Sequence, residues 1–378
     1  MAVPDRIEAR RGVAIPVFDP RPDIEPIRAE VLEAIAGVVD SGRFILGEQV
    51  AGLEDEVAAY LGVRHAVGVN SGTDALVIAL RSLGVGPGHE VITTPFTFFA
   101  TPEAVTTIGA TPMFVDIDPA TFTIDPSAIE AAITARTAAI VPVHLFGLAA
   151  DMDPILEVAR RHGLRVVEDL AQAMGGSAGG RKLGTIGDAA ALSFFPTKNL
   201  GGFGDGGMIV TDDDEAAALA RKLRTHGSAK KYANELFGYN SRLDELQAAV
   251  LRVRLRTLDD ANAARRGAAA RYDELLDGID GLARPIAARA AGHVYHQFTI
   301  RVPGGRRDEV RDRLGAEGIG TAVYYPIPCH RLPPYADLGV TLAEAEAAAA
   351  EVLSLPMWPS IPDDAVRAVG DALGRAMR

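Results

Sequence analysis

Between residues 65 and 211, short apolar runs rich in β-branched residues alternate with segments whose apolar positions recur at helical spacing. This alternation predicts an α/β arrangement built on a largely parallel sheet. Seven runs have the length and composition of strands: His65–Val69, Glu90–Thr94, Thr111–Asp116, Ala138–His144, Arg165–Asp169, Ala191–Phe195 and Gly207–Thr211.

The pattern changes after the last of these runs. A long helical segment is expected from about Asp244 to Leu276. Two alanine-rich helices are expected near the C-terminus, after three shorter elements: Val294–Val302, Arg307–Glu317 and Gly320–Tyr325. Because 378 residues exceed the usual size of one hydrophobic core, two domains are predicted. Residues 1–255 form a large α/β domain with an N-terminal arm, and residues 256–378 form a smaller α+β domain.

Composition narrows the class of protein. The chain is 48% hydrophobic, and its 38 basic and 50 acidic residues give a net charge of −12, which argues against nucleic acid or an anionic membrane as partner. The single cysteine, Cys329, excludes an intramolecular disulfide, and the first residues lack the apolar centre of a secretion signal. The longest apolar stretch, Ala138–Ala150, is too short to span a bilayer. We expect a cytoplasmic enzyme.

The segment Ala191–Gly207 ends an apolar run on Lys198 and continues into glycine-rich backbone. An ε-amine beside aromatic side chains and fixed charge loses its proton more readily, and a neutral amine attacks an aldehyde. Lys198 is therefore a candidate covalent anchor for pyridoxal 5'-phosphate (PLP). The alternative is an ordinary exposed lysine at the end of a strand.

The turn Ser71-Gly72-Thr73 lies between a strand-like run and a helical pattern. At a helix N-terminus, unpaired backbone N–H groups and the helix dipole favour a phosphate, and the two hydroxyls add donors. The alternative is a simple Ser/Thr helix cap.

Two acids end the run Arg165–Asp169. A carboxylate at the carboxyl end of a parallel strand can keep a pyridine nitrogen protonated, and Asp169 is the candidate for this role. Glu168 is expected to be a solvated acid. Gln172 could bond to the cofactor's ring oxygen, and Phe98, in an aromatic cluster after another strand, is the candidate to stack on the ring. No metal site is predicted.

These segments resemble the DegT/DnrJ/EryC1/StrS family of sugar aminotransferases in order and spacing, from about Pro16 to the C-terminus. The motifs that carry the resemblance are Ser-Gly-Thr-Asp-Ala (71–75), Pro-Phe-Thr-Phe-Phe-Ala-Thr (95–101), Glu-Asp-Leu-Ala-Gln-Ala (168–173), Ser-Phe-Phe-Pro-Thr-Lys-Asn-Leu-Gly (193–201) and Gly-Tyr-Asn-Ser-Arg-Leu-Asp-Glu-Leu-Gln-Ala-Ala (238–249). The resemblance implies the fold of fold-type I PLP-dependent transferases, with a seven-stranded, mostly parallel sheet in the large domain.

The resemblance also implies roles for individual residues. Lys198 would form the Schiff base with PLP, Asp169 would face the pyridine nitrogen, Gln172 would lie near the ring hydroxyl and Phe98 would stack on the ring. The phosphate would be held by Ser71, Gly72, Thr73 and Ser193. Asn240 matches a position that reaches the phosphate from a neighbouring subunit, which implies an obligate homodimer with shared active sites.

The implied reaction moves an amino group from an amino acid, with L-glutamate expected by analogy, to a keto-sugar, in most cases a nucleotide-linked one. Retention of Lys198 favours transamination over the dehydration that relatives with His at this position perform. Two departures from the family are Met174 in place of a frequent His, which removes a polar group expected near the cofactor face, and Thr197 in place of Ser. A keto-cyclitol acceptor and a non-catalytic regulator that senses PLP or a sugar are the alternatives.

An anionic nucleotide-sugar needs local cations in a chain this acidic. The candidates are Arg181, Lys182, His226, Lys230 and Lys231, each of which could instead be a solvated surface group. A second set lies in the aromatic and proline-rich segment 324–335, which could line the acceptor pocket or simply close the domains: Tyr324, Tyr325, His330 and Tyr335.

Overall fold

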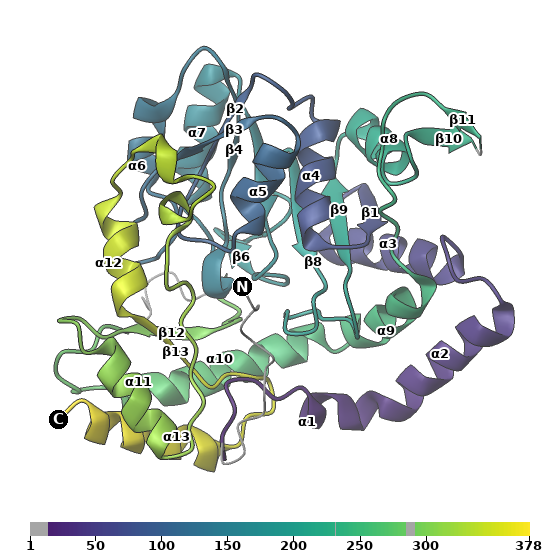
Figure 1. Cartoon of the computed structure of the whole chain (residues 1–378). Helices are drawn as coiled ribbons and strands as arrows, with labels where there is room; N and C mark the ends of the chain where they lie inside the picture. The colour runs from purple at the N-terminus through teal and green to yellow at the C-terminus, as the bar shows by residue number, and fades with distance from the viewer. Residues whose placement is uncertain (1–13, 231, 285–291) are drawn as a thin grey trace.

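The computed structural model describes residues 14–230, 232–284 and 292–378. Within these ranges one seven-stranded sheet has the order β1-β9-β8-β5-β4-β2-β3 (Figure 1). Its strands are β1 (His65–Val69), β2 (Glu90–Thr93), β3 (Thr111–Phe114), β4 (Thr137–Val141), β5 (Arg165–Asp169), β8 (Ala189–Ser193) and β9 (Gly207–Thr211). The predicted α/β fold with a seven-stranded sheet is confirmed.

Six of the seven strands share one direction. The pairs β2–β3, β2–β4, β4–β5 and β5–β8 are parallel, whereas β9 is antiparallel to both β1 and β8. The end of the sheet where β5 finishes at Asp169 and β8 at Ser193 is called the carboxyl end below. The opposite end, where β1 begins at His65 and β2 at Glu90, is called the amino end.

The strand expected over Ala191–Phe195 begins two residues earlier, at Ala189, and ends at Ser193. Alanine is a weak strand former, so the pattern alone gives no reason to begin the strand at Ala189. In the structure β8 lies between β5 and β9, and Ala189, Ala190 and Ala191 are all buried. Burial at the centre of the sheet therefore overrides the local propensity.

Helices cover both faces of the sheet. Alternate strand residues such as Val67 and Val167 form a core cluster with the helices on one face, and Ala66 and Ala190 belong to the cluster on the other face. The first face carries α4 (Gly72–Ser82), α5 (Ala100–Thr107) and α8 (Asp214–Leu223). The second carries α3 (Glu48–Leu61), α6 (Pro126–Ile129), α7 (Met152–His162) and α9 (Glu245–Leu255).

A separate core cluster organises the C-terminal region, which lies beside the carboxyl end of the sheet (Figure 1). There β12 (Phe298–Arg301) pairs antiparallel with β13 (Val352–Leu355). The helices are α10 (Leu258–Leu275), α11 (Arg307–Ala316), α12 (Ala343–Glu351) and α13 (Asp363–Ala376). Among the described residues no helix is both long and apolar enough to cross a membrane.

Three features of this region differ from the sequence pattern. The long helical segment is two helices, α9 and α10, separated at Arg256 and Thr257. The run expected at Gly320–Tyr325 is no strand, because only Ala322 forms a bridge, with Ser354. Finally, Ile15 bridges Ile319, so the described part of the N-terminal arm packs on the C-terminal core. Two helices follow this arm, α1 (Arg21–Ile24) and α2 (Arg28–Ser41).

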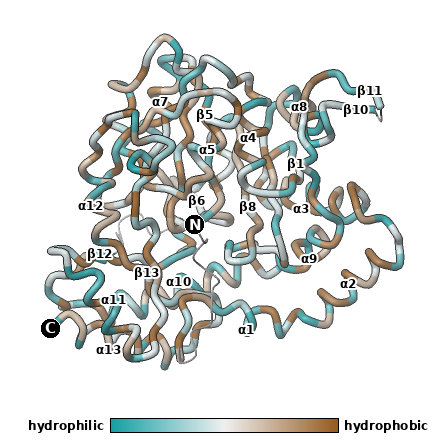
Figure 2. The backbone as a smooth tube through the Cα atoms, viewed as in Figure 1, coloured by the Kyte–Doolittle hydropathy of each residue, from teal (hydrophilic) through white to brown (hydrophobic). Residues whose placement is uncertain are grey.

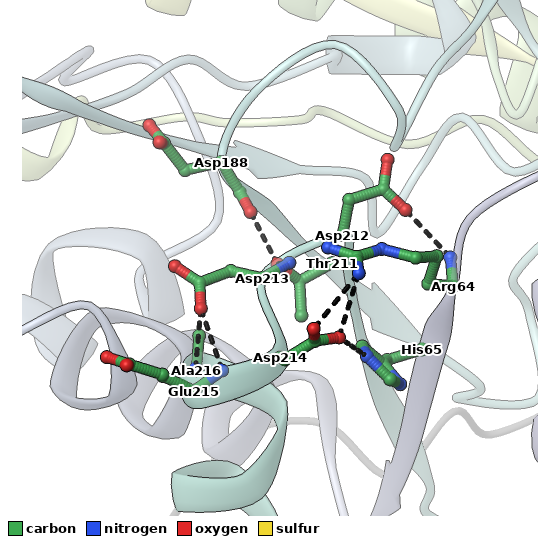
Figure 3. A network of polar contacts seen from close by, with 9 residues as sticks. All are labelled: Arg64, His65, Asp188, Thr211, Asp212, Asp213, Asp214, Glu215 and Ala216. Atoms are coloured by element: carbon green, nitrogen blue, oxygen red, sulfur yellow. Dashed lines mark hydrogen bonds and ion pairs between the residues drawn. The ribbon is translucent and has the colours of Figure 1, made fainter.

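Charged groups at the amino end of the sheet are paired (Figure 3). The Asp214 carboxylate lies 2.6 Å from His65 Nε2 and 3.0 Å from Arg64 Nη1, and Asp212 accepts the Arg64 backbone N–H. Asp213 caps α8 by accepting the backbone N–H groups of Glu215 and Ala216. This end of the sheet is therefore a closed, hydrogen-bonded surface.

Candidate active site

Lys198 lies in the turn that follows β8, where its backbone N–H donates to the carbonyl of Phe195 at 2.8 Å. Burial lowers the pKa of its ammonium to about 8, because the charged form loses hydration, and the more distant Asp169 carboxylate opposes this shift. Among the described residues, no carboxylate forms an ion pair with this amine. The neutral amine that a nucleophile requires is therefore more accessible at Lys198 than at an ordinary lysine.

Asp169 ends β5 and is 5% exposed. Its Oδ2 accepts a hydrogen bond from the Thr101 hydroxyl at 2.8 Å, and its Oδ1 accepts the Ala171 backbone N–H at 3.1 Å. Burial raises the pKa of this carboxyl, and these hydrogen bonds together with the charge of Lys198 act in the opposite direction. The carboxylate is oriented by neutral donors, and a cation brought next to it would offset the effect of burial.

Glu168 is not the solvated acid expected from the sequence, because its side chain is fully buried. Its carboxylate accepts the backbone N–H groups of residues 184, 186 and 187 and lies 2.9 Å from His144 Nε2. His144 Nδ1 accepts the Ala150 backbone N–H, so the ring proton is on Nε2 and is donated to Glu168. Adjacent strand residues point to opposite faces, so Glu168 anchors a loop while Asp169 faces the site.

The turn Ser71-Gly72-Thr73 begins α4, as predicted, and Ser71 Oγ accepts the Asp74 backbone N–H at 3.0 Å. A Cβ atom on Gly72 would lie 2.6 Å from Ser193 Cβ, and one on Gly207 would lie 2.2 Å from the Ser71 carbonyl oxygen. The first turn of α4 thus packs against the β8–β9 pair as closely as glycine allows. The N–H groups at the start of α4 lie here together with the hydroxyl groups of the Ser71–Thr73 turn and of Ser193. Such a set of donors suits a phosphate group.

Gln172 is buried, and its amide bonds to the Phe146 backbone N–H at 2.8 Å and to the Tyr325 hydroxyl at 2.9 Å. Phe98 is 58% exposed although it is a large apolar residue, and its ring packs against Tyr325 with centroids 6.2 Å apart. An exposed aromatic ring beside buried polar groups is available to stack on a flat ligand. Whether Phe98 and Gln172 contact a cofactor stays a prediction.

The predicted substrate residues are scattered. Lys182 donates to the Tyr60 carbonyl, and Arg181 pairs with Asp153. His226 and Lys230 are exposed at the hairpin of β10 (Ser228–Lys230) and β11 (Ala233–Asn234), which projects from the body beside α8 (Figure 1). Asn240 follows this hairpin and is also exposed, whereas Lys231 lies outside the described residues.

The segment 324–335 packs against the loop that carries Phe98, because the Cys329 backbone N–H donates to the Pro95 carbonyl at 2.8 Å. Tyr324 is partly buried there. His330 is 2% exposed, and its Nε2 lies 3.0 Å from the Glu346 carboxylate, an arrangement that holds the segment in place. Tyr335 bonds to the Thr106 hydroxyl at 2.9 Å. His330 Nδ1 has no hydrogen-bond partner among the described residues, and whether His330 reaches a substrate stays a prediction.

Three residues near the site were missed by the sequence reasoning. Thr101 bonds to Asp169. The only sequence signal for this role is that its hydroxyl stands at the end of the aromatic motif 95–101. His144 holds Glu168, and in the sequence it stands out only as the last residue of a strand-like run. His296 is also buried near Lys198. Burial is the main reason that the pKa of the His296 imidazole lies well below its ordinary value, and the charge of Lys198 lowers this pKa further. Its Nδ1 has no hydrogen-bond partner among the described residues.

Met174 is buried in the hydrophobic core of the large sheet region. Its side chain is 5% exposed and belongs to the core cluster that also contains Leu53 and Leu251. A second short hairpin, β6 (Ser177–Ala178) and β7 (Arg181–Lys182), follows it in the chain. The thioether side chain fills the core there, and the expected loss of a polar group near the cofactor face stays a prediction.

Comparison with known proteins decides the family. The model of the "DegT/DnrJ/EryC1/StrS aminotransferase family" matches residues 25–374 of this chain. The chain belongs to this family. A UDP-N-acetyl-3-dehydro-α-D-glucosamine 3-aminotransferase of Acidithiobacillus ferrooxidans is 49% identical over 368 residues, which are 97% of this chain and 99% of that protein. A dTDP-3-amino-3,4,6-trideoxy-α-D-glucose transaminase of Streptomyces venezuelae is 49% identical over 362 residues, 95% of each chain.

Solved structures of this family agree with the fold. The structure of S. venezuelae DesV in complex with a ketimine intermediate has a TM-score of 0.93 and 48% identity, covering 96% of this chain and 98% of that chain. That of NtdA from Bacillus subtilis with bound cofactor PMP has a TM-score of 0.88 and 36% identity, covering 92% and 81%. This member of the DegT/DnrJ/EryC1/StrS family is a sugar aminotransferase with the fold of PLP-dependent transferases.

Proposed function

We propose that this protein uses PLP to move an amino group from an amino acid, with L-glutamate as the expected donor, to the keto group of a nucleotide-linked sugar. The observation that supports the proposal is the convergence of Lys198, Asp169 and the Ser71–Thr73 turn at the carboxyl end of the sheet. Bound PLP supplies an aldehyde that takes up the amino group and a ring that withdraws electrons from the reacting carbon.

The groups around the site divide the work. With PLP bound, Lys198 would hold the aldehyde through its neutral amine, and as a free amine it would be the base that carries a proton at the reacting carbons. Asp169 holds the proton on the ring nitrogen, and that cation offsets the effect of burial on the carboxylate. Ser71, Gly72, Thr73 and Ser193 would bind the phosphate, because Gly72 lets the first turn of α4 pack closely on Ser193 and so brings these groups together. 

A second copy of the chain completes the site in this proposal. Apolar side chains are exposed along α2 and the segment after it, where Val39 is 56% and Phe44 is 48% exposed, and apolar stretches of α2 are visible in Figure 2. Exposed apolar surface of this kind is typical of subunit interfaces. Asn240, exposed at the base of the β10–β11 hairpin, would reach the phosphate of the partner. The domain boundary near residue 255 stays a prediction.

The negative charge of the sugar nucleotide would be met by basic side chains that form no ion pair among the described residues. Arg181 and Lys182 are engaged with Asp153 and the Tyr60 carbonyl, so the exposed Lys230 and His226 of the hairpin are the better candidates. On a projecting hairpin they would bind the diphosphate of a substrate in the neighbouring subunit. Tyr324 would line the acceptor pocket.

The experiment that tests the proposal is a visible absorbance spectrum of the purified protein before and after addition of L-glutamate. The wild-type protein should show the band of lysine-linked PLP, and L-glutamate should replace it with the band of the aminated cofactor. Lys198→Ala should bind PLP without the lysine-linked band and lose turnover. Lys222→Ala is the matched control, because Lys222 pairs with Glu235 on the surface. Turnover by Lys198→Ala would contradict the proposal.

The acceptor is tested separately. Turnover with nucleotide-linked keto-sugars and none with free keto-cyclitols would support the proposed substrate class, and the reverse would favour the cyclitol alternative. The second alternative is a regulatory role. It is favoured by a relative from Geobacillus stearothermophilus that carries the name "Pleiotropic regulatory protein". This relative is 50% identical over 355 residues, which are 93% of this chain and 95% of that protein. A protein that binds PLP but fails to react with any amino donor would favour that role.

A further inference from the structure

The orientation of the Gln172 amide is fixed by its hydrogen bonds. The Phe146 backbone N–H can only donate, so the amide atom 2.8 Å from it is the oxygen, Oε1. Nε2 is then the atom that lies 2.9 Å from the Tyr325 hydroxyl, to which it donates one of its two hydrogens. The second N–H hydrogen of Gln172 has no acceptor among the described residues.

Tyr325 comes from the C-terminal region and reaches into this site across the boundary between the two cores. Its ring packs edge-on against Phe96, with centroids 6.3 Å apart, and tilted against Phe98. Cys329, four residues later, ties the same segment to the Phe98 loop through a bond to the Pro95 carbonyl. The Tyr325 ring therefore has little freedom, and its hydroxyl is a fixed point for Gln172.

The Tyr325 hydroxyl keeps its own proton while it accepts from Gln172. Burial raises the pKa of this phenol above its ordinary value, so the group stays neutral. Within the described part of the chain the bond to Gln172 is the only hydrogen bond of this side chain. If the hydroxyl were removed, Gln172 would keep only the Phe146 bond, and its Nε2 could rotate away from its present position.

We propose that Tyr325 is a positioning residue that holds the Gln172 amide so that its remaining N–H points at the ring oxygen of bound PLP. This inference rests on the proposed function. A hydrogen bond donated to that oxygen withdraws negative charge from it. The proton on the adjacent lysine-linked nitrogen is then held less tightly. Tyr325 thereby sets the pH at which the lysine-linked cofactor loses this proton, without itself touching the reacting atoms.

The test is a pH titration of the visible band of the lysine-linked cofactor in Tyr325→Phe. Loss of the hydroxyl should raise the midpoint by about one pH unit, a shift comparable to one hydrogen bond to a charged group. Gln172→Ala should raise the midpoint at least as far, because it removes the donor itself. The double variant should show no further shift beyond that of Gln172→Ala, since Tyr325 acts through Gln172.

The matched control is Tyr272→Phe. Tyr272 is fully buried and its hydroxyl donates to the Pro356 carbonyl at 2.9 Å in the C-terminal core, so this variant makes the same chemical change away from the site. It should lower thermal stability and leave the midpoint unchanged. A Tyr325→Phe midpoint equal to wild type, or a double variant that adds the two single shifts, would overturn the inference. A wild-type protein that shows no band would overturn the proposed function and this inference with it.

Discussion

At the amino end of the sheet, Asp214 bonds to Arg64 and His65, and the buried Glu90 is held by Arg136 and the Thr134 hydroxyl. At the carboxyl end, Lys198 has no carboxylate partner within ion-pairing distance among the described residues. Its neighbour Asp169 is held only by a hydroxyl and a backbone N–H. The same sheet thus carries paired charges at one end and buried, incompletely paired charges at the other.

The difference follows from what each end does. Exposed ion pairs contribute little to stability, and solvent and neighbouring charges satisfy them. Buried groups without counter-ions are costly, and a chain retains them where a ligand supplies the missing partner. The contrast favours the carboxyl end as the functional end of the sheet, because both ends are made of the same strands.

The largest effect should follow from closing the glycine contact at the carboxyl end. In Gly72→Ala, the new Cβ would meet Ser193 Cβ at 2.6 Å and force the first turn of α4 away from β8. Overpacking of this kind costs about 1–3 kcal/mol, equivalent to a roughly 5- to 150-fold loss of PLP affinity. Titration of the apoprotein with PLP measures it. Gly315→Ala, at a helical glycine with open space around its Cα, is the control and should bind PLP normally. Unchanged affinity in Gly72→Ala would remove this turn from the phosphate site.

At Glu168 we expect a smaller effect on PLP affinity but a clear loss of unfolding free energy. Glu168→Gln replaces the carboxylate that accepts three backbone N–H groups and the His144 proton by an amide with fewer acceptor sites, and about 1–3 kcal/mol of unfolding free energy should be lost. Denaturant unfolding at pH 7 measures the loss. Glu157→Gln is the control, because Glu157 forms an exposed pair with Arg161.

The pH dependence of unfolding gives Glu168 a second signature. Its hydrogen bonds hold the pKa of this carboxyl below the ordinary value of 4.5, despite the opposing effect of burial. The folded-state pKa is the lower one, so this contribution to stability is fully present above pH 4.5 and is lost as the pH falls through the folded-state pKa. Glu168→Gln should therefore flatten the acid limb of the wild-type stability profile. An unchanged acid limb would contradict the assignment of the anchor.

The smallest effect is expected at the amino end. Asp214→Asn removes an exposed partner of Arg64 and His65 (Figure 3), and solvent can replace both contacts. Thermal unfolding should change little, and the PLP band should be identical to that of wild type. A Tm loss as large as that of Glu168→Gln would mean that the two ends of the sheet do not differ as described.

The sequence pattern predicted the sheet well where strands are apolar and β-branched. The bounds of β1, β5 and β9 agree with the prediction, whereas β8 begins two residues early because Ala189 and Ala190 acquire strand structure from their neighbours. The turn at Ser71 was predictable because a cap, a glycine and a helical period coincide there. Local chemistry was sufficient in each of these places.

Long-range contacts were beyond the pattern. The role of Glu168 depends on His144 and on three backbone N–H groups from a loop, none of which has a local signature. The Gln172–Tyr325 bond joins residues 153 positions apart. Gly320–Tyr325 has strand composition and forms only one bridge, between Ala322 and Ser354 of β13. Local motifs were enough to propose the residues of the site, but they carry no signal for the contacts that hold those residues in place.

The pairing of Ile15 with Ile319 also bears on how the chain is made. During synthesis the arm leaves the ribosome early, while the strand β13 that completes the same core is made near the end. Ile15 and Phe18 must therefore wait, exposed to water and to chaperones, while the sheet folds ahead of them. We expect the arm to be captured only after the C-terminal core has formed, because that core provides the surface on which Ile15 and Phe18 pack.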